Sequence, residues 1–285
     1  MLVLVSLDFH VHPWTKEFMM KNGPIVKACK FFRLDMEKLP TSIDQLVEEM
    51  DVAGVERAVI LGQDTHATKN RNFKNYTIRN DQLASIASKS RDRLIPFAGV
   101  DPNATADGVK ELRRAVRKLG VKGLKIHSSA NSVYPNDPKR MYPLYELLQE
   151  HGLPILFHTG TTGLGDCEIR FSKPEYLDEV CEHFPDLKVV MAHFGWPWSD
   201  VALALALRHP NVYLDVSGWR PRYLPQNVLS YLNGPLQDRF LFGTDYPMMR
   251  QKEWMDDFEA NLKPKLKPGV ASKLLKDNAE RLLGA

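Results

Sequence analysis

Two histidines, His10 and His12, stand two residues apart near the start of the chain, at the end of an apolar run. Side chains two apart in a β-strand point to the same side, so a strand here would present both imidazoles together. Three further side chains able to bind a metal or move a proton follow later apolar runs, namely His158, His193 and Asp245. Imidazoles with a carboxylate suit a divalent ion such as zinc, with one position open for water. We therefore expect metal chemistry if the fold brings these five residues together.

Eight short apolar runs recur along the chain, and most of them precede a stretch with the polarity of a surface helix. Each run is nearly continuous rather than alternating, which is typical of parallel strands covered on both faces. We expect strands at residues 2–9, 55–61, 94–100, 121–126, 153–157, 187–192, 212–216 and 240–242. We expect helices at 41–53, 72–90, 104–119, 138–151, 174–184, 198–209, 223–233, 253–262 and 270–283. This alternation predicts βα units and a parallel sheet.

The number of units favours an α/β fold of the (β/α)8 or TIM-barrel type. A closed barrel of eight such units is usually formed by about 250 residues, so the 285 residues of this chain are predicted to form a single domain over 1–285. A doubly wound open sheet is the alternative, which the number of strands alone does not exclude. In a barrel the C-terminal ends of the strands share one rim, so the five candidate residues would converge there.

One connection is longer than the usual loop between a strand and its helix, the segment from Pro13 to Pro40. It carries the aromatic Trp14 and the cationic Arg33. We interpret this insertion after the first strand as a lid or a pocket wall. The alternative is an insertion that only packs on the rim of the barrel.

Lys125 lies inside the fourth apolar run, where a lysine is costly unless it is paired or modified. It could bind a substrate carboxylate, carry a carbamate that bridges two metal ions, or pair with an acidic residue inside the barrel. His127 ends the same run and is a candidate for the pocket lining. The remaining histidines are expected to be structural, three of them near helix C-termini where an imidazole suits the helix dipole: His66, His151, His183 and His209.

The composition excludes several classes of function. The net charge of +3 and the lack of a basic block give no case for nucleic acid as a partner. Three cysteines without a CxxC spacing fit reduced thiols better than a disulfide framework. No apolar run approaches the ~20 residues needed to cross a bilayer, and the apolar start lacks the basic region of a signal peptide. We expect a cytoplasmic protein with no nucleic-acid or membrane partner.

Six motifs, in this order, resemble the amidohydrolase superfamily over essentially the whole chain. They are LDFHVH at 7–12, LFHTG at 156–160, VMAHFG at 190–195, VYLD at 212–215, GTDYP at 243–247 and NAERLLG at 278–284. The resemblance is greatest to the amidohydrolase-2 branch, which includes aminocarboxymuconate-semialdehyde decarboxylase and related lyases and hydrolases. The motifs are specific for the superfamily and not for the reaction.

The resemblance implies a distorted (β/α)8 barrel that binds a divalent metal ion, most often zinc, with manganese as another candidate. The implied metal ligands are His10, His12, His158 and Asp245. Asp245 and His193 would be the catalytic residues, the first moving protons and the second orienting the metal-bound water or polarising the substrate. A homodimer is a further expectation that comes from the family alone.

Two reactions fit these expectations. We favour a hydrolase in which metal-activated water attacks a small amide, lactone or ester that bears a carboxylate. The alternative is a metal-dependent decarboxylase of an aromatic or muconate-type acid. It would need a cationic anchor, for which Arg33, Arg170 and Arg220 are candidates, although each is more simply interpreted as an ordinary surface arginine. A non-catalytic metal- or ligand-binding barrel is the third interpretation. Tryptophans that follow strand ends are candidates to wall a ring-shaped substrate, or else pack between loops and helices: Trp14, Trp196, Trp198 and Trp219.

Overall fold

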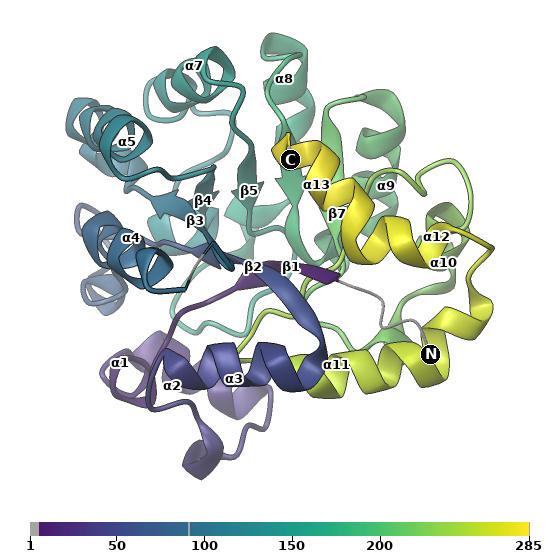
Figure 1. Cartoon of the computed structure of the whole chain (residues 1–285). Helices are drawn as coiled ribbons and strands as arrows, with labels where there is room; N and C mark the ends of the chain where they lie inside the picture. Colours follow the sequence, from purple (N-terminus) through teal and green to yellow (C-terminus); the bar gives the residue numbers. More distant parts are fainter. Residues whose placement is uncertain (1–5, 91, 285) are drawn as a thin grey trace.

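The chain folds into a barrel of eight parallel strands that neighbour one another in sequence order, surrounded by helices (Figure 1). The computed structural model describes residues 6–90 and 92–284. The strands are β1 Ser6–Val11, β2 Val55–Leu61, β3 Leu94–Gly99, β4 Leu124–Ile126, β5 Ile155–Phe157, β6 Val189–Met191, β7 Val212–Asp215 and β8 Phe240–Leu241. All eight correspond to expected runs, although residues 2–5 of the first expected strand lie outside the described residues.

The last strand returns to the first, which closes the sheet. Phe9 N donates to Phe242 O at 2.8 Å, and Val11 forms a parallel bridge with Tyr246. Closure confirms the (β/α)8 barrel and excludes the doubly wound open sheet.

The helices that surround the strands are α3 Asp44–Ala53, α4 Asn80–Ser88, α5 Ala106–Lys118, α7 Tyr142–Glu150, α8 Tyr176–His183, α9 Ser199–Arg208, α10 Gln226–Leu232 and α11 Gln251–Asp257. Further helices are α1 Lys16–Met20, α2 Gly23–Phe31, α6 Ser128–Asn131, α12 Val270–Ser272 and α13 Asn278–Leu283. Wider π-helical turns at Phe258–Leu262 and Lys273–Asp277 extend α11 and join α12 to α13. Within residues 6–90 and 92–284, no helix has both the length and the apolar character that crossing a membrane requires.

The expected helix at 72–90 is wrong over its first half. Residues Arg71–Phe73 form a 3-10 turn capped by the Asn70 side chain, and α4 begins only at Asn80. Between them, Ile78 N donates to Gln63 O at 2.8 Å in an antiparallel bridge. Long-range pairing with the end of β2 therefore overrides the local helical pattern of this segment.

A bulge in β1 changes which side chains face the barrel interior. From Asp8 to Val11 the chain advances three residues, while its partner in β2 advances only two, from Ala58 to Ile60. An extra residue in one strand breaks the strict alternation of side chains. Phe9 packs edge-to-face on Phe97 inside the barrel, with ring centroids 5.5 Å apart. The next residue, His10, also reaches the interior.

The barrel interior towards the N-terminal ends of the strands is filled by a layer of side chains that we call the plug. Lys125, Leu156 and Val190 are register partners on β4, β5 and β6, so their side chains share the inner face. The apolar members of this inner layer form one buried cluster: Leu7, Phe9, Val59, Leu61, Ile95, Phe97, Leu156, Val190, Ala192 and Leu241. Ala279 and Leu282 of α13 pack on the same cluster and close the N-terminal end of the barrel.

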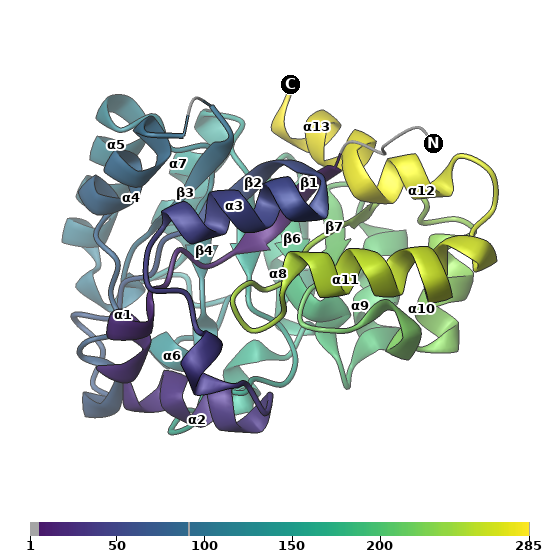
Figure 2. The same ribbon diagram turned by 60° about the horizontal axis from the view of Figure 1, so that its bottom comes forward.

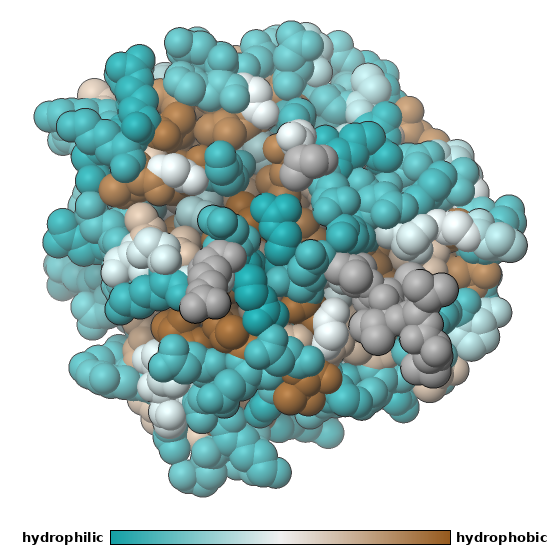
Figure 3. Space-filling view, in the orientation of Figure 1, coloured by the Kyte–Doolittle hydropathy of each residue, from teal (hydrophilic) through white to brown (hydrophobic). Residues whose placement is uncertain are grey.

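The opposite end of the barrel carries the insertion after β1. Figure 2 shows α1, α2 and α6 gathered at one end and α13 at the other. Pro13 to Pro40 contributes α1 and α2, so the insertion packs on the rim where the strands end. The face that carries α13 is mostly hydrophilic, with scattered hydrophobic side chains (Figure 3). Sites in barrels of this type lie at the C-terminal ends of the strands, so a buried site is expected at the rim that the insertion covers.

Candidate metal centre

The structure brings the five sequence-predicted residues together at the C-terminal rim. His10 is in β1 and His12 directly follows it, while His158 follows β5 and His193 lies in the turn after β6. Asp245 follows β8. All five are buried. The convergence expected from strand ends alone is therefore observed, and the roles of these residues remain predictions.

Asp245 is the point where the first-strand histidines meet. Its Oδ1 atom lies 3.1 Å from His12 Nε2 and 3.5 Å from His10 Nε2. The ligand atoms of these three residues all lie within 4.8 Å of one another, close enough to share one metal ion. Lys125 Nζ approaches the same place, 3.4 Å from His10 Nε2.

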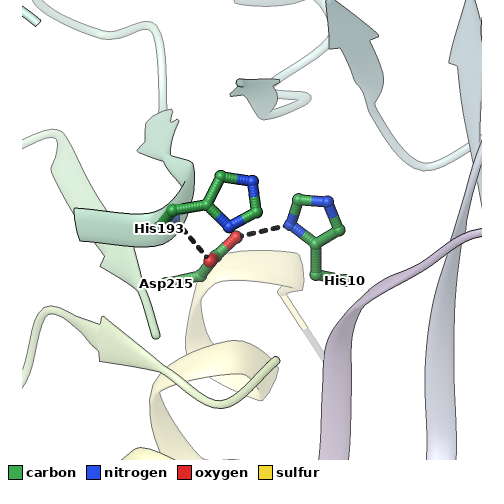
Figure 4. A group of neighbouring side chains, drawn as sticks. All are labelled: His10, His193 and Asp215. Atoms are coloured by element: carbon green, nitrogen blue, oxygen red, sulfur yellow. Dashed lines mark hydrogen bonds and ion pairs between the residues drawn. The ribbon is translucent and has the colours of Figure 1, made fainter. Parts of the chain in front are cut away.

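Asp215, at the end of β7, holds His10 from behind (Figure 4). Its Oδ2 accepts from His10 Nδ1 at 2.9 Å. Its Oδ1 accepts from the backbone N–H groups of His193 and Ser217, each at 3.0 Å, and from the Ser217 hydroxyl. These hydrogen bonds use both carboxylate oxygens. His10, His193 and Asp215 also lie close enough to share a metal ion, but Asp215 is already engaged as an orienting carboxylate, an arrangement common behind metal-binding histidines.

A hydrogen-bond chain runs from Ser217 through His193 to His158. His193 Nδ1 lies 2.9 Å from the Ser217 carbonyl oxygen, which can only accept, so this nitrogen carries the proton. His193 Nε2 then accepts from His158 Nδ1 at 3.2 Å. The chain leaves His158 Nε2 with a lone pair, and that atom is buried without a hydrogen-bond partner among the described residues.

The donor set fits a divalent cation. His10 donates through Nδ1 to Asp215, so its Nε2 presents a lone pair towards the Asp245 carboxylate. A lone pair facing a carboxylate in a buried site is unfavourable unless a cation lies between them. Neutral imidazole nitrogens with one carboxylate are the usual ligands of zinc and related ions. The ligand atoms of His10, His12 and Asp245 lie together, and the unpartnered Nε2 of His158 makes this residue the fourth that could hold the ion.

Burial keeps four imidazoles of the site neutral. It lowers the pKa of His10 to about 3 and holds the pKa values of His12, His127 and His158 well below the ordinary value. Neutral histidine is the form that binds metal. Burial also lowers the pKa of Lys125 to about 8, although Asp215 and Asp245 oppose this shift.

A cavity of about 270 Å³ opens above this cluster. Its floor is polar and its walls are largely aromatic. The polar lining includes His12, Lys125, His127, His158, Thr161, Thr162, His193 and Asp245. The apolar lining includes Trp14, Phe31, Phe32, Tyr76, Leu164, Trp196, Trp219 and Met248. Five predicted substrate-binding residues thus line the cavity: Trp14, Lys125, His127, Trp196 and Trp219. The insertion supplies Trp14, Phe31 and Phe32, so it is a pocket wall as well as a rim element.

The arginines proposed as carboxylate anchors lie elsewhere. Arg33 lines a neighbouring depression of about 470 Å³ that shares Phe32 and Trp219 with the cavity. Arg170 pairs with Glu168, and Arg220 pairs with Glu253. Lys125 is the cationic side chain in the cavity lining.

The other predicted residues of uncertain role have structural partners. Trp198 lies against Lys173, with the ammonium 5.8 Å from the ring centroid. His151 bonds to the Leu147 carbonyl, His183 to the Tyr142 hydroxyl and His209 to Asp178. His66 pairs with Asp64 on the surface.

Several residues of the site are absent from the predicted set, among them Asp215, Ser217 and Tyr76. Asp215 ends the seventh apolar run, so the argument from strand ends that selected Asp245 applies to it equally. Ser217 lies two residues further on the same inward-facing side. Tyr76 had no signal, because it lies within the segment that was expected to be helical.

A parallel barrel with buried histidines and aspartates at its C-terminal rim is the architecture of a metal-dependent barrel enzyme. A family model described as Amidohydrolase matches residues 7–285. The chain belongs to this amidohydrolase-2 family.

Curated relatives include both lyases and hydrolases. A 2-amino-3-carboxymuconate-6-semialdehyde decarboxylase from Dictyostelium discoideum is 26% identical over 137 residues, covering 41% of this chain and 36% of that protein. A dihydroorotase from Vibrio vulnificus is 31% identical over 132 residues, covering 45% and 38% respectively. The match thus spans little more than a third of either relative. A gamma-resorcylate decarboxylase from Polaromonas sp. is 23% identical over 304 residues, covering 90% of this chain and 91% of that protein.

Solved structures share the whole fold. An uncharacterised TIM-barrel protein from Bordetella bronchiseptica has a TM-score of 0.82 and 27% identity, with 99% of each chain covered. A 5-carboxyvanillate decarboxylase from Novosphingobium aromaticivorans, complexed with manganese and 4-hydroxy-3-methoxy-5-nitrobenzoic acid, has a TM-score of 0.72 and 19% identity, covering 99% of this chain and 96% of that chain. At this identity the second likeness concerns the fold alone.

Proposed function

We propose that this protein is a metal-dependent decarboxylase that removes CO₂ from an aromatic or muconate-type carboxylic acid. The sequence alone favours hydrolysis and leaves this reaction as the alternative. The named relatives change that order, because a gamma-resorcylate decarboxylase aligns over 90% of the chain whereas the dihydroorotase aligns over 45%.

The observation that carries the proposal is the cavity of about 270 Å³, with aromatic walls above a polar floor. Binding sites of this kind hold a ligand by apolar contact and orient it with a few polar groups. Trp14, Trp196 and Trp219 offer ring faces that suit a flat, unsaturated substrate. An apolar cavity also strips water from a carboxylate, which favours its conversion to uncharged CO₂.

A divalent ion bound by His10, His12, His158 and Asp245 would supply positive charge that attracts the acidic substrate and stabilises negative charge during reaction. We propose zinc as this ion, because three imidazoles and one carboxylate match its preferred ligands. Manganese is the alternative, supported by its presence in the structure of the 5-carboxyvanillate decarboxylase.

The chain's own residues would divide the remaining work. Lys125, buried in the floor, would pair with the substrate carboxylate in place of the arginines that lie outside the cavity. His127 Nδ1 accepts from Ala130 N at 3.3 Å, so its Nε2 carries the proton. Thr162 Oγ1 lies 3.5 Å from this Nε2, which can donate to that hydroxyl or to a ligand in the cavity. Asp245 would deliver the proton to the carbon that loses CO₂, so that a C–H bond replaces the broken C–C bond.

Hydrolysis remains the second candidate. The dihydroorotase relative at 31% identity favours it. The buried Lys125 favours it as well, because a lysine in this position could carry a carbamate that bridges two metal ions. In that reaction Asp245 would accept the proton of the attacking water and pass it to the leaving group.

A substrate screen tests the proposal. Protein loaded with zinc or with manganese would be incubated with hydroxybenzoates and muconates, and separately with dihydroorotate, lactones and amides. We expect CO₂ release from at least one acid, with no hydrolytic turnover. Hydrolysis of a lactone or amide without CO₂ release from any acid would overturn decarboxylation in favour of the second candidate. Metal analysis of the purified protein would decide between zinc and manganese.

A further inference from the structure

One buried carboxylate near the metal cluster, that of Asp8, is not used by the proposed reaction and does not line the cavity. Asp8 lies in β1, two residues before His10, and its exposed fraction is 0%. Burying a carboxylate is costly unless other groups compensate its charge. The partners of Asp8 therefore indicate what this side chain does.

Four hydrogen bonds converge on the Asp8 carboxylate. Its Oδ1 accepts from the backbone N–H groups of His10 at 3.1 Å and of Thr244 at 3.0 Å. Its Oδ2 accepts from the Thr244 hydroxyl at 2.6 Å and from the Gln251 side-chain amide at 2.9 Å. Gln251 is the first residue of α11 and is also fully buried. Asp8 thus joins β1, the segment after β8 and the start of α11.

Thr244 extends this contact to both sides of Asp245. Its N–H and its hydroxyl donate to Asp8, and its Oγ1 accepts from Tyr246 N at 3.1 Å. Asp245 N donates to His10 O at 2.8 Å, and His12 N donates to Tyr246 O at 2.7 Å. The backbone is therefore tied to the first strand before, at and after Asp245.

The backbone of Asp245 depends on such support. Its φ of 67° lies in the left-handed region, which is uncommon for a residue with a Cβ atom, although aspartate tolerates it better than most. Conformations of this kind persist where surrounding contacts fix them. With this backbone, Asp245 Oδ1 lies 3.1 Å from His12 Nε2 and 3.5 Å from His10 Nε2. A change to ordinary backbone angles would redirect the carboxylate away from the two histidines.

We propose that Asp8 is a positioning residue, which acts through Thr244 to hold the Asp245 carboxylate against His10 and His12. Asp215 orients the His10 ring, whereas Asp8 fixes the two backbone segments that carry the ligands relative to each other. This inference rests on the metal site of the proposed function and applies to either candidate reaction.

Zinc and cobalt binding test this role without turnover. Metal-free protein would be titrated with zinc against a chelator, and with cobalt, whose visible spectrum depends on the number and geometry of its ligands. Thr244→Val removes the hydroxyl and keeps the side-chain shape, and Asp8→Asn replaces one acceptor oxygen with a donor amide. We expect both variants to weaken zinc binding by about 10–100-fold and to alter the cobalt spectrum. Thr244→Ser keeps the hydroxyl and should retain the wild-type spectrum.

A second buried carboxylate, that of Asp101, provides the matched control. It is also 0% exposed, does not line the cavity, and accepts from Ala67, Asn103 and Asn131. Asp101→Asn should lower the melting temperature, as Asp8→Asn does, and leave zinc affinity and the cobalt spectrum unchanged. The Asp8→Asn, Thr244→Val double variant should bind zinc about as tightly as Asp8→Asn alone, because both changes act on one contact.

Wild-type zinc affinity and cobalt spectra in Asp8→Asn and Thr244→Val would overturn the positioning role, and so would an equal change in Asp101→Asn. Protein that binds neither ion would overturn it together with the metal site. Thermal melts establish that each variant is folded. If Asp8→Asn does not fold, the comparison of Thr244→Val with Thr244→Ser decides the question.

Decarboxylation is judged separately by CO₂ release from wild-type protein. Altered cobalt spectra in the variants, without CO₂ release from any acid, would defeat the proposed function and keep the role of Asp8. CO₂ release with unaltered spectra in the variants would do the opposite.

Discussion

His158 Nδ1 lies 3.2 Å from His193 Nε2, and this contact links the positions of the protons on the two imidazoles. Because His193 Nδ1 is bound to the Ser217 carbonyl oxygen, His193 presents only a lone pair to its neighbour. His158 must then place its proton on Nδ1 and its lone pair on Nε2. In this arrangement His193 positions a candidate metal ligand, a role different from the polarisation of water or substrate that the family resemblance implies.

His193→Ala should therefore weaken metal binding as well as turnover. Loss of a partner behind a metal-binding histidine typically reduces metal affinity by about 10–100-fold. Chelator competition measures the affinity, and nitrogen-15 NMR of metal-free protein reads the tautomer of His158 directly. We expect one tautomer in wild-type protein and a mixture in the variant. His151→Ala, which removes an imidazole that only caps a helix, is the control. Unchanged affinity and tautomer would return His193 to a purely catalytic role.

Asp215→Asn should also lower metal affinity, by about 10–100-fold. An asparagine cannot accept on both side-chain atoms, so either His10 Nδ1 or the Ser217 and His193 backbone groups lose their partner. Chelator competition again measures the effect. Asp178→Asn is a matched control, because Asp178 accepts from His209 at 2.7 Å and neither residue lines the cavity. Equal affinities for the two variants would contradict the orienting role of Asp215.

Asp245→Asn separates proton transfer from metal binding. Asparagine keeps an oxygen beside His12 but cannot carry a proton, so turnover should fall by about 10²–10⁴-fold in protein that still contains metal. Steady-state rates normalised to bound metal, measured beside an Asp186→Asn surface control, test this. Wild-type rates at full metal content would remove Asp245 from the catalytic step.

Metal-free protein should lose stability as the pH falls below about 6.5. His10, His12, His127 and His158 have lowered pKa values in the folded state, with burial as the largest cause. Below pH 6.5 these histidines bind protons in the unfolded chain but not in the folded protein, so the free energy of unfolding decreases as the pH falls. The decrease is up to about 1.4 kcal/mol per histidine and pH unit.

Asp8 acts in the opposite direction. Burial raises its pKa from 3.8 to about 6, so between these values the folded state binds the extra proton and gains stability as the pH falls. Four histidines outweigh one carboxyl group, and a net loss is expected. Thermal melts in EDTA at pH 8, 7, 6 and 5 provide the measurement. A melting temperature that is constant or rises towards pH 5 would show that the imidazoles are not held neutral.

The sequence allowed the barrel to be predicted because its strands are continuous apolar runs with helices between them. It also located His158, His193 and Asp245, since each lies within three residues of the end of such a run. Tyr76 could not be found in this way. Its placement depends on a long-range bridge between Gln63 and Ile78, which leaves no periodic pattern.

The arginines illustrate a different limit. Arg170 and Arg220 lie in the segments that follow β5 and β7, but each pairs with a nearby glutamate. Position after a strand predicts that a residue is near the rim, and only the packed structure determines whether its side chain turns into the cavity or out to solvent.

The bulge in β1 has a consequence for how this protein can change over evolution. The extra residue between Asp8 and Val11 allows both Phe9 of the plug and His10 of the histidine pair to face the barrel interior. Substitutions among Leu7, Phe9 and Phe97 can repack the plug without rotating His10 and His12. A single-residue deletion at the bulge would restore strict alternation, so His10 and His12 would still face the interior while the plug would lose the packing of one side chain. The plug and the histidine pair can therefore change independently.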